Sequence, residues 1–157
     1  MCSFNIIKKI LGSLEKINYY TQRRGPDKTT INKIYDITFI HNLLQITGDP
    51  TPQPFIKDNI VCVFNGQIYN YLEFGDYKSD GYCLIDLYQQ YGINFTKKLD
   101  GEFAIAMVDF DKKTIIISSD IFATKPLYYC FEPNINNPIE SNFMISSYDN
   151  AIKANNM

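Results

Sequence analysis

Apolar residues along the chain recur with two spacings, one typical of helices and one typical of strands. Four apolar residues three and four positions apart predict a helix over 8–20: Ile10, Leu11, Leu14 and Ile17. A short strand is predicted before it, at 2–7, and Gly25-Pro26-Asp27 interrupts the pattern after it. The segment 34–46, rich in Ile and Phe, is predicted to be extended, and a Pro-rich loop follows at 49–54.

The second half of the chain predicts more strands and one further helix. The uninterrupted apolar run at 60–64 is typical of a strand buried on both faces. Ser79 and Asp80 are typical of a helix start and Gly92 of a helix end. Hairpin-linked strands are expected at 103–110 and 114–118, with later strands at 126–131 and 142–147. Hairpin-linked strands pair antiparallel, so the fold class is α+β with mainly antiparallel sheets.

Length and composition narrow the class of protein. The chain of 157 residues fits a single domain spanning 1–157. With 45% hydrophobic and 20% charged residues it is not a disordered chain. A net charge of -2 argues against a nucleic-acid partner, and no apolar run is long enough to span a membrane. Because Lys8-Lys9 interrupts the apolar start before a signal peptide forms, a cytoplasmic location is expected.

The four cysteines, Cys2, Cys62, Cys83 and Cys130, form no CxxC pair. Neither a disulfide framework nor a metal site is therefore expected, and no cofactor is indicated. Cys62, Cys83 and Cys130 lie in apolar segments and are predicted to be core residues.

Cys2 has a chemistry of its own because of its position. Methionine aminopeptidases remove Met1 when the second residue is small, which would leave a thiol and a free α-amine on Cys2. Such an amine is partly neutral at physiological pH and can activate the thiol as a base. Asn65-Gly66 offers an amide and an unobstructed backbone N–H as an oxyanion hole. The plainer alternatives are an ordinary cysteine and an ordinary Asn-Gly turn.

A series of motifs in fixed order adds a resemblance to a known family. After Met1-Cys2-Ser3 come Arg24-Gly25-Pro26-Asp27, Asn65-Gly66-Gln67-Ile68-Tyr69-Asn70-Tyr71, Ser79-Asp80, Leu99-Asp100-Gly101-Glu102-Phe103-Ala104 and Asp120-Ile121-Phe122-Ala123-Thr124-Lys125-Pro126-Leu127-Tyr128-Tyr129. The series resembles the glutaminase domain of glutamine-hydrolysing asparagine synthetases, which are class II amidotransferases of the N-terminal nucleophile hydrolase superfamily. The resemblance implies a four-layer αββα sandwich of two mainly antiparallel sheets.

The resemblance also implies roles for single residues. Cys2 would be the nucleophile, and Asn65 and Gly66 would form the oxyanion hole. Asp80 matches the aspartate that binds the α-ammonium of glutamine, and a helix N-cap is its structural alternative. Arg24 belongs to a segment that shapes the substrate site.

Several positions depart from the family pattern. The arginine that pairs with the α-carboxylate of glutamine is Leu43 here, so a strong charge-assisted contact is missing. The glutamate near the ligand's amino group is Gln67, and a family glycine is Ala123. Arg23 is the candidate that could reach the vacated position.

These residues support two functional interpretations. In the first, the chain is a stand-alone glutaminase that acts on glutamine or a related amide and supplies ammonia to a separate synthetase. In the second, it is a pseudo-amidotransferase that keeps the fold as a binding or regulatory module. ATP binding is not expected, since the sequence has no SGGxDS phosphate loop.

Overall fold

The computed structural model describes residues 1–46, 49–132 and 137–157. Its strands are β1 (Ser3–Ile7), β2 (Lys28–Ile34), β3 (Ile37–Leu43), β4 (Phe55–Lys57), β5 (Ile60–Ile68), β6 (Gly101–Asp109), β7 (Thr114–Ser119), β8 (Tyr128–Phe131) and β9 (Phe143–Ser146). Its α-helices are α1 (Leu14–Gln22), α2 (Cys83–Tyr91) and α3 (Asp149–Ala154). Three 3₁₀ segments are η1 (Tyr71–Glu73), η2 (Asp80–Tyr82) and η3 (Gly92–Lys98).

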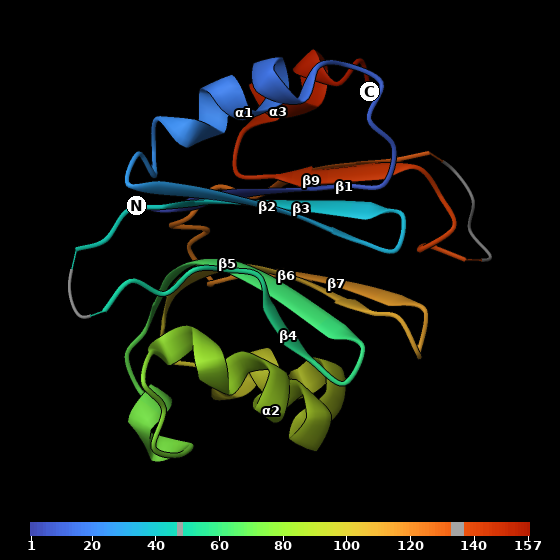
Figure 1. Cartoon of the computed structure of the whole chain (residues 1–157). Coiled ribbons are helices and arrows are strands. Elements are labelled where there is room, and N and C mark those ends of the chain that lie inside the picture. The colour runs from blue at the N-terminus through green and yellow to red at the C-terminus, as the bar shows by residue number, and fades with distance from the viewer. Residues whose placement is uncertain (47–48, 133–136) are drawn as a thin grey trace.

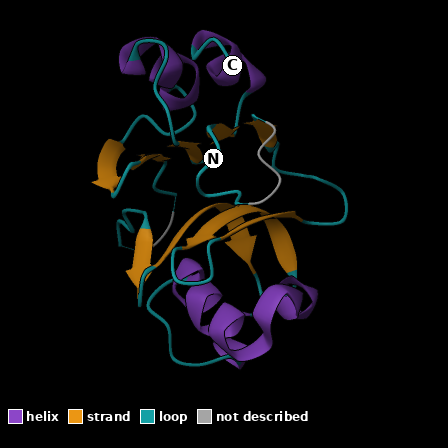
Figure 2. Cartoon of the chain, turned by 90° about the vertical axis from the view of Figure 1, so that its right-hand side faces the viewer, coloured by secondary structure: helices purple, strands orange, loops and turns teal. Residues whose placement is uncertain are grey.

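Two antiparallel sheets lie face to face, and helices cover the outer face of each (Figure 1). Sheet A has the strand order β2-β3-β1-β9-β8, and sheet B has the order β4-β5-β6-β7. Helices α1 and α3 lie outside sheet A, while α2 lies outside sheet B, as the turned view also shows (Figure 2). The predicted four-layer αββα sandwich is confirmed. No helix in the described part of the chain is long and apolar enough to cross a membrane.

Side-chain alternation along the strands produces the layers. In β5, Ile60, Cys62 and Phe64 face α2, whereas Val61 and Val63 face sheet A. The prediction of a strand buried on both faces is therefore confirmed. A third cluster lies between sheet A and its helices, and it joins strand residues Ile7, Ile40 and Met144 to helix residues Ile17, Ala151 and Ile152. Each aliphatic residue that is fully buried in this way stabilises the fold by about 1.5–3 kcal/mol.

The prediction of a helix over 8–20 is wrong at its start. Helix α1 begins at Leu14, and the apolar residues Ile10 and Leu11 are 40% and 44% exposed. Asn155 holds the preceding segment as a loop, because its Oδ1 accepts hydrogen bonds from the N–H groups of Leu11 and Gly12 at 2.8 and 3.1 Å. A contact across most of the sequence thus overrides the local helical spacing.

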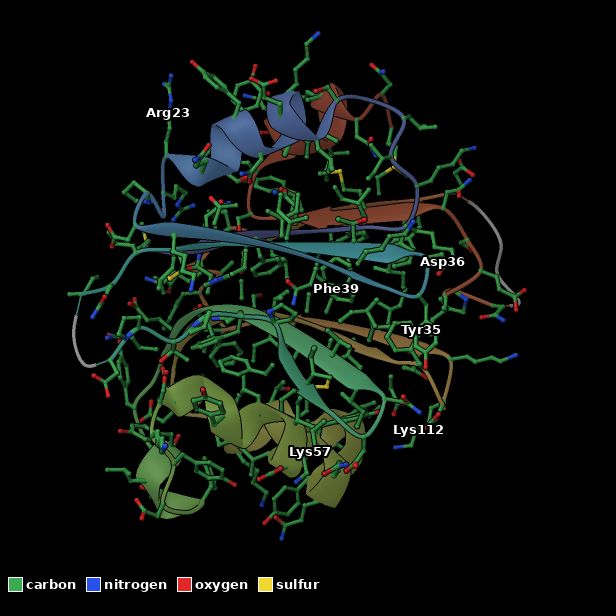
Figure 3. All side chains as sticks on the ribbon, viewed as in Figure 1. Arg23, Tyr35, Asp36, Phe39, Lys57 and Lys112 are labelled. Atoms are coloured by element: carbon green, nitrogen blue, oxygen red, sulfur yellow. The ribbon has the colours of Figure 1, made fainter. Side chains whose placement is uncertain are left out.

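The segment 34–46 is not one extended piece. β2 ends at Ile34, and the backbone turns at Tyr35 and Asp36 before β3 begins. Tyr35 has a φ of 54°, in the left-handed region, although turns of this kind favour Asn and Gly. Its ring packs against Phe110 with centroids 4.7 Å apart, which anchors the turn to the end of sheet B (Figure 3). This contact supports the turn, in which Asp36 is the only residue of a type that favours turns.

Other local predictions are confirmed. The hairpin of β6 and β7 and the strands β8 and β9 form as expected. Gly92, with a φ of 60°, ends α2. Cys62 and Cys83 are fully buried, and the partly buried Cys130 packs against the cluster beneath α1 and α3.

Candidate active site

Cys2 lies just before β1, beside the neighbouring strand β3. The register pairs Ser3 with Asn42, so Cys2 stands next to Leu43. Its Sγ accepts a hydrogen bond from the backbone N–H of Leu44 at 3.4 Å and lies 3.7 Å from the Leu44 carbonyl oxygen. Burial raises the pKa of the Cys2 thiol, so the thiol is protonated at neutral pH. A nucleophile here needs a base to remove this proton.

Cys2 lines a cleft of about 630 Å³ whose walls come from both sheets. Sheet A contributes the end of β3 and the residues after it, and sheet B contributes the end of β5. The cleft contains every predicted site residue except Arg24, namely Cys2, Leu43, Asn65, Gly66, Gln67 and Asp80. Residues distant in the sequence therefore meet in one cavity of the size that suits a small ligand.

Asn65 and Gly66 lie near the end of β5. Asn65 is 1% exposed, and its Nδ2 has no hydrogen-bond partner among the described residues. A buried donor without a partner costs about 1–3 kcal/mol, so an amide left unpaired beside a cleft is typical of a ligand site. Gly66 has a φ of 148°, and a Cβ there would lie 2.0 Å from the carbonyl oxygen of Glu102. Only glycine fits this close approach of β5 to β6.

Asp80 lies where η2 meets the end of β5. Its Oδ2 accepts a hydrogen bond from the N–H of Ile68 at 2.9 Å, and its Oδ1 accepts from the N–H of Gly81 at 2.9 Å and from Ser79 Oγ at 3.1 Å. The predicted helix cap differs from this arrangement, because Ser79 caps no backbone N–H and Asp80 bridges to β5 instead. An ionised carboxylate accepts about four hydrogen bonds, so one acceptor position is left for a ligand.

An ion pair that the sequence did not indicate also lies in the cleft. Lys125, 6% exposed, donates from Nζ to Glu102 Oε1 at 2.8 Å, and both residues line the cleft. Glu102 stands opposite Gln67 in the pairing of β5 with β6. Both residues belong to motifs of the resemblance, but nothing in the order of the motifs indicates that they pair.

The N-terminal amine lies among charges. Burial lowers the pKa of the Met1 α-amine, and the positive charges of Arg24 and Lys125 lower it further against the opposing effects of Cys2 and Asp27. Lys125 Nζ and Arg24 Nη2 lie 3.4 and 3.2 Å from Met1 Sδ. These surroundings favour a neutral amine at this end of the chain.

The two arginines lie outside the cleft lining. Arg23 follows the end of α1, where its guanidinium lies 4.4 Å from the centroid of the Tyr19 ring and points away from the sheets (Figure 3). Arg24 lies over the Tyr148 ring at 5.3 Å. The position next to Cys2 is filled by Leu43, which is 7% exposed.

His41 lies two residues before Leu43 on β3, among core residues. It is fully buried, and neither ring nitrogen has a hydrogen-bond partner within residues 1–46, 49–132 and 137–157. Burial lowers its pKa to about 4, so the imidazole is neutral at physiological pH. In the same residues, no group of three or more His, Cys, Asp or Glu side chains gathers as metal ligands would.

Comparisons with known proteins identify the family of the whole domain. A family profile described as "Glutamine amidotransferase domain" matches residues 1–157. The glutamine-hydrolyzing asparagine synthetase 2 of Bacillus subtilis (strain 168) is 32% identical over 139 residues, which cover 82% of this chain and 18% of that protein. The glutamine-hydrolyzing asparagine synthetase 2 of Oryza sativa subsp. japonica is 34% identical over 119 residues, covering 68% of this chain and 20% of the relative. The chain thus spans about a fifth of the length of these relatives.

A solved structure with a similar fold is the glutamine phosphoribosylpyrophosphate amidotransferase from B. subtilis complexed with ADP and GMP. The TM-score is 0.65 at 16% sequence identity, and the match covers 99% of this chain and 44% of that one. At this identity the likeness concerns the fold alone. The family profile and the synthetase relatives place the chain in the class II glutamine amidotransferase family, as a domain related to that of the asparagine synthetases.

Proposed function

We propose that this domain hydrolyses the side-chain amide of glutamine or a related amide to a carboxylate and ammonia through a thioester on Cys2. The observation that carries the proposal is the unpaired Nδ2 of Asn65, buried in the wall of the cleft that also holds the Cys2 thiol. A free donor and a nucleophile in one cleft are the two groups that acyl transfer requires.

Removal of Met1 would supply the base. The new α-amine of Cys2 would then lie one residue from the place of the Met1 amine. There, burial and the positive charges of Arg24 and Lys125 lower the pKa of an amine. A neutral amine can take the proton of the Cys2 thiol, whose own pKa is raised by burial.

The reaction then proceeds in two steps. The Cys2 sulfur attacks the amide carbon, and the developing oxyanion accepts hydrogen bonds from Asn65 Nδ2 and the Gly66 N–H. The amine returns the proton to the departing nitrogen, so the C–N bond breaks and ammonia leaves a thioester. Water then attacks the thioester, which releases the acid and restores the thiol. We propose that a synthetase accepts the ammonia.

A second candidate is a pseudo-amidotransferase that binds a ligand or a partner without turnover. Leu43 favours it, because an apolar residue occupies the position next to Cys2 where the resemblance implies an arginine. Hydrolysis is the better-supported proposal, since this chain has the nucleophile Cys2, the unpaired amide of Asn65 and the Asp80 carboxylate that the family pattern implies.

Ammonia release by the purified, Met1-processed protein tests the proposal. Cys2→Ala should abolish release, and Asn65→Ala should lower kcat about 10²–10³-fold, as the loss of one oxyanion donor does. Asn32→Ala, which removes an exposed amide on β2, is the matched control and should keep the wild-type rate. Equal kcat values for Asn65→Ala and the wild type would remove Asn65 from the mechanism.

A further inference from the structure

The wall of the cleft next to Cys2 is mainly apolar and carries no cation. Leu43 stands beside Cys2 across the β1–β3 pairing, and Leu44 and Ile46 continue the same wall, with the uncharged Gln45 between them. At 7% exposure Leu43 has little contact with water, so a ligand atom placed against it would lose its hydration. An ionised carboxylate placed there would have no positively charged partner on this wall.

No lysine in the described cleft lining is placed to act as the arginine that the resemblance implies at the position of Leu43. Lys125 is buried and bound to Glu102 at 2.8 Å, so its charge is already compensated. The remaining cation of the lining, Lys78, is an exposed residue. Arg23 and Arg24 lie against aromatic rings outside the lining.

The acidic groups of the cleft favour a positively charged group on the ligand. Asp80 is held by three donors and keeps one acceptor position, and Asp49 also lines the cleft. Lys125 and Glu102 neutralise each other. The lining therefore offers an ammonium group an acidic partner but offers a carboxylate no buried, uncompensated cation. A ligand with a free amine and a neutral group at the carboxyl end fits this distribution.

Two exposed apolar side chains at the rim of the cleft can contact a ligand that is longer than one amino acid. Ile46 and Tyr69, 71% and 60% exposed, both line the cleft. Large apolar side chains at the mouth of a polar site can pack against the residue that follows a bound N-terminal residue.

We propose that the preferred substrate is an N-terminal glutaminyl residue of a peptide, not free glutamine. The α-amine binds Asp80, the side-chain amide meets Cys2 and Asn65, and the neutral peptide carbonyl lies beside Leu43. Hydrolysis through the Cys2 thioester breaks the C–N bond of the side-chain amide, which yields an N-terminal glutamyl peptide and ammonia and leaves the peptide bond intact. This inference rests on the proposed amide hydrolysis.

The experiment compares kcat/KM for glutamine, glutaminamide and glutaminyl-leucinamide, with ammonia release and product mass as readouts. The two compounds with a neutral carboxyl end should exceed glutamine in kcat/KM roughly tenfold or more, the range of one charge-assisted contact, and the leucinamide should be the best of the three. Leu43→Arg should reverse the order, mainly by lowering KM for glutamine. Leu43→Met, which adds no charge, should keep the wild-type order.

The outcomes separate the two proposals. Equal or better hydrolysis of free glutamine by the wild type would overturn the inference and leave the proposed function standing. If Lys78→Gln then removed that activity, Lys78 would be the carboxylate partner that the inference denies. Hydrolysis of none of the three amides by the Met1-processed protein would overturn the proposed function and the inference together.

Discussion

His41 should make the stability of the folded domain depend on pH between about 6.5 and 4. It is fully buried without a hydrogen-bond partner among the described residues, and burial lowers its pKa from 6.5 to about 4. In this range the unfolded protein binds a proton that the folded protein does not. Because the folded-state pKa is depressed for a basic group, stability is full above pH 6.5 and is lost as the pH falls toward 4.

The size of the change in the free energy of unfolding follows from the lowered pKa of His41. Each pKa unit corresponds to 1.36 kcal/mol, so the free energy of unfolding should fall by about 2 kcal/mol between pH 7 and 5 and by about 3 kcal/mol near pH 4. The sequence has one histidine, so no other histidine contributes. Urea unfolding followed by circular dichroism measures the change, since the protein has no Trp to serve as a fluorescent probe.

His41→Phe is the matched control, because it keeps an aromatic ring in the core and removes the titrating group. Its free energy of unfolding should change by much less than that of the wild type over the same pH range. An imidazole pKa near 6.5 in the folded protein, read by nuclear magnetic resonance, would refute the reasoning. So would the same pH dependence in both proteins.

Two further predictions concern the loop after β7. Ala123 has a φ of 50°, so Ala123→Gly should raise the free energy of unfolding by about 0.5–1 kcal/mol; a decrease in urea unfolding experiments would contradict the strain argument. Burial opposes ionisation of Asp120, but hydrogen bonds from Thr124, Phe122 and Phe103 outweigh burial and lower its pKa. Its stabilisation should therefore be present above pH 3.8 and lost below it. Asp120→Asn should destabilise the domain by about 1.5–3 kcal/mol at pH 7, and an unchanged urea midpoint would contradict this.

The sequence predicts those features of the fold that depend on residues close together in the chain. The apolar run in β5 predicted burial on both faces, and the polar residues between β6 and β7 predicted their hairpin. The resemblance to the amidotransferase family implied that Cys2, Asn65 and Asp80 belong to one site, and all three line one cleft.

Features that depend on distant contacts were not predictable in this way. Asn155 delays the start of α1, and Phe110 supports the turn at Tyr35. Lys125 contacts Glu102 from a distant segment of the chain. That His41 is buried without a hydrogen-bond partner among the described residues follows only from the packing of the two sheets. Each of these results from side chains meeting across the fold, which no local spacing records.

In the proposed mechanism Cys2 becomes an N-terminal nucleophile facing Asn65 and Gly66. Intact mass, measured before and after treatment with a diazoketone analogue of glutamine, tests this role of Cys2. We expect a protein that lacks Met1 and gains a single adduct, and the adduct should be lost in Cys2→Ala. Retention of Met1, or labelling confined to Cys62, Cys83 or Cys130, would contradict the claim.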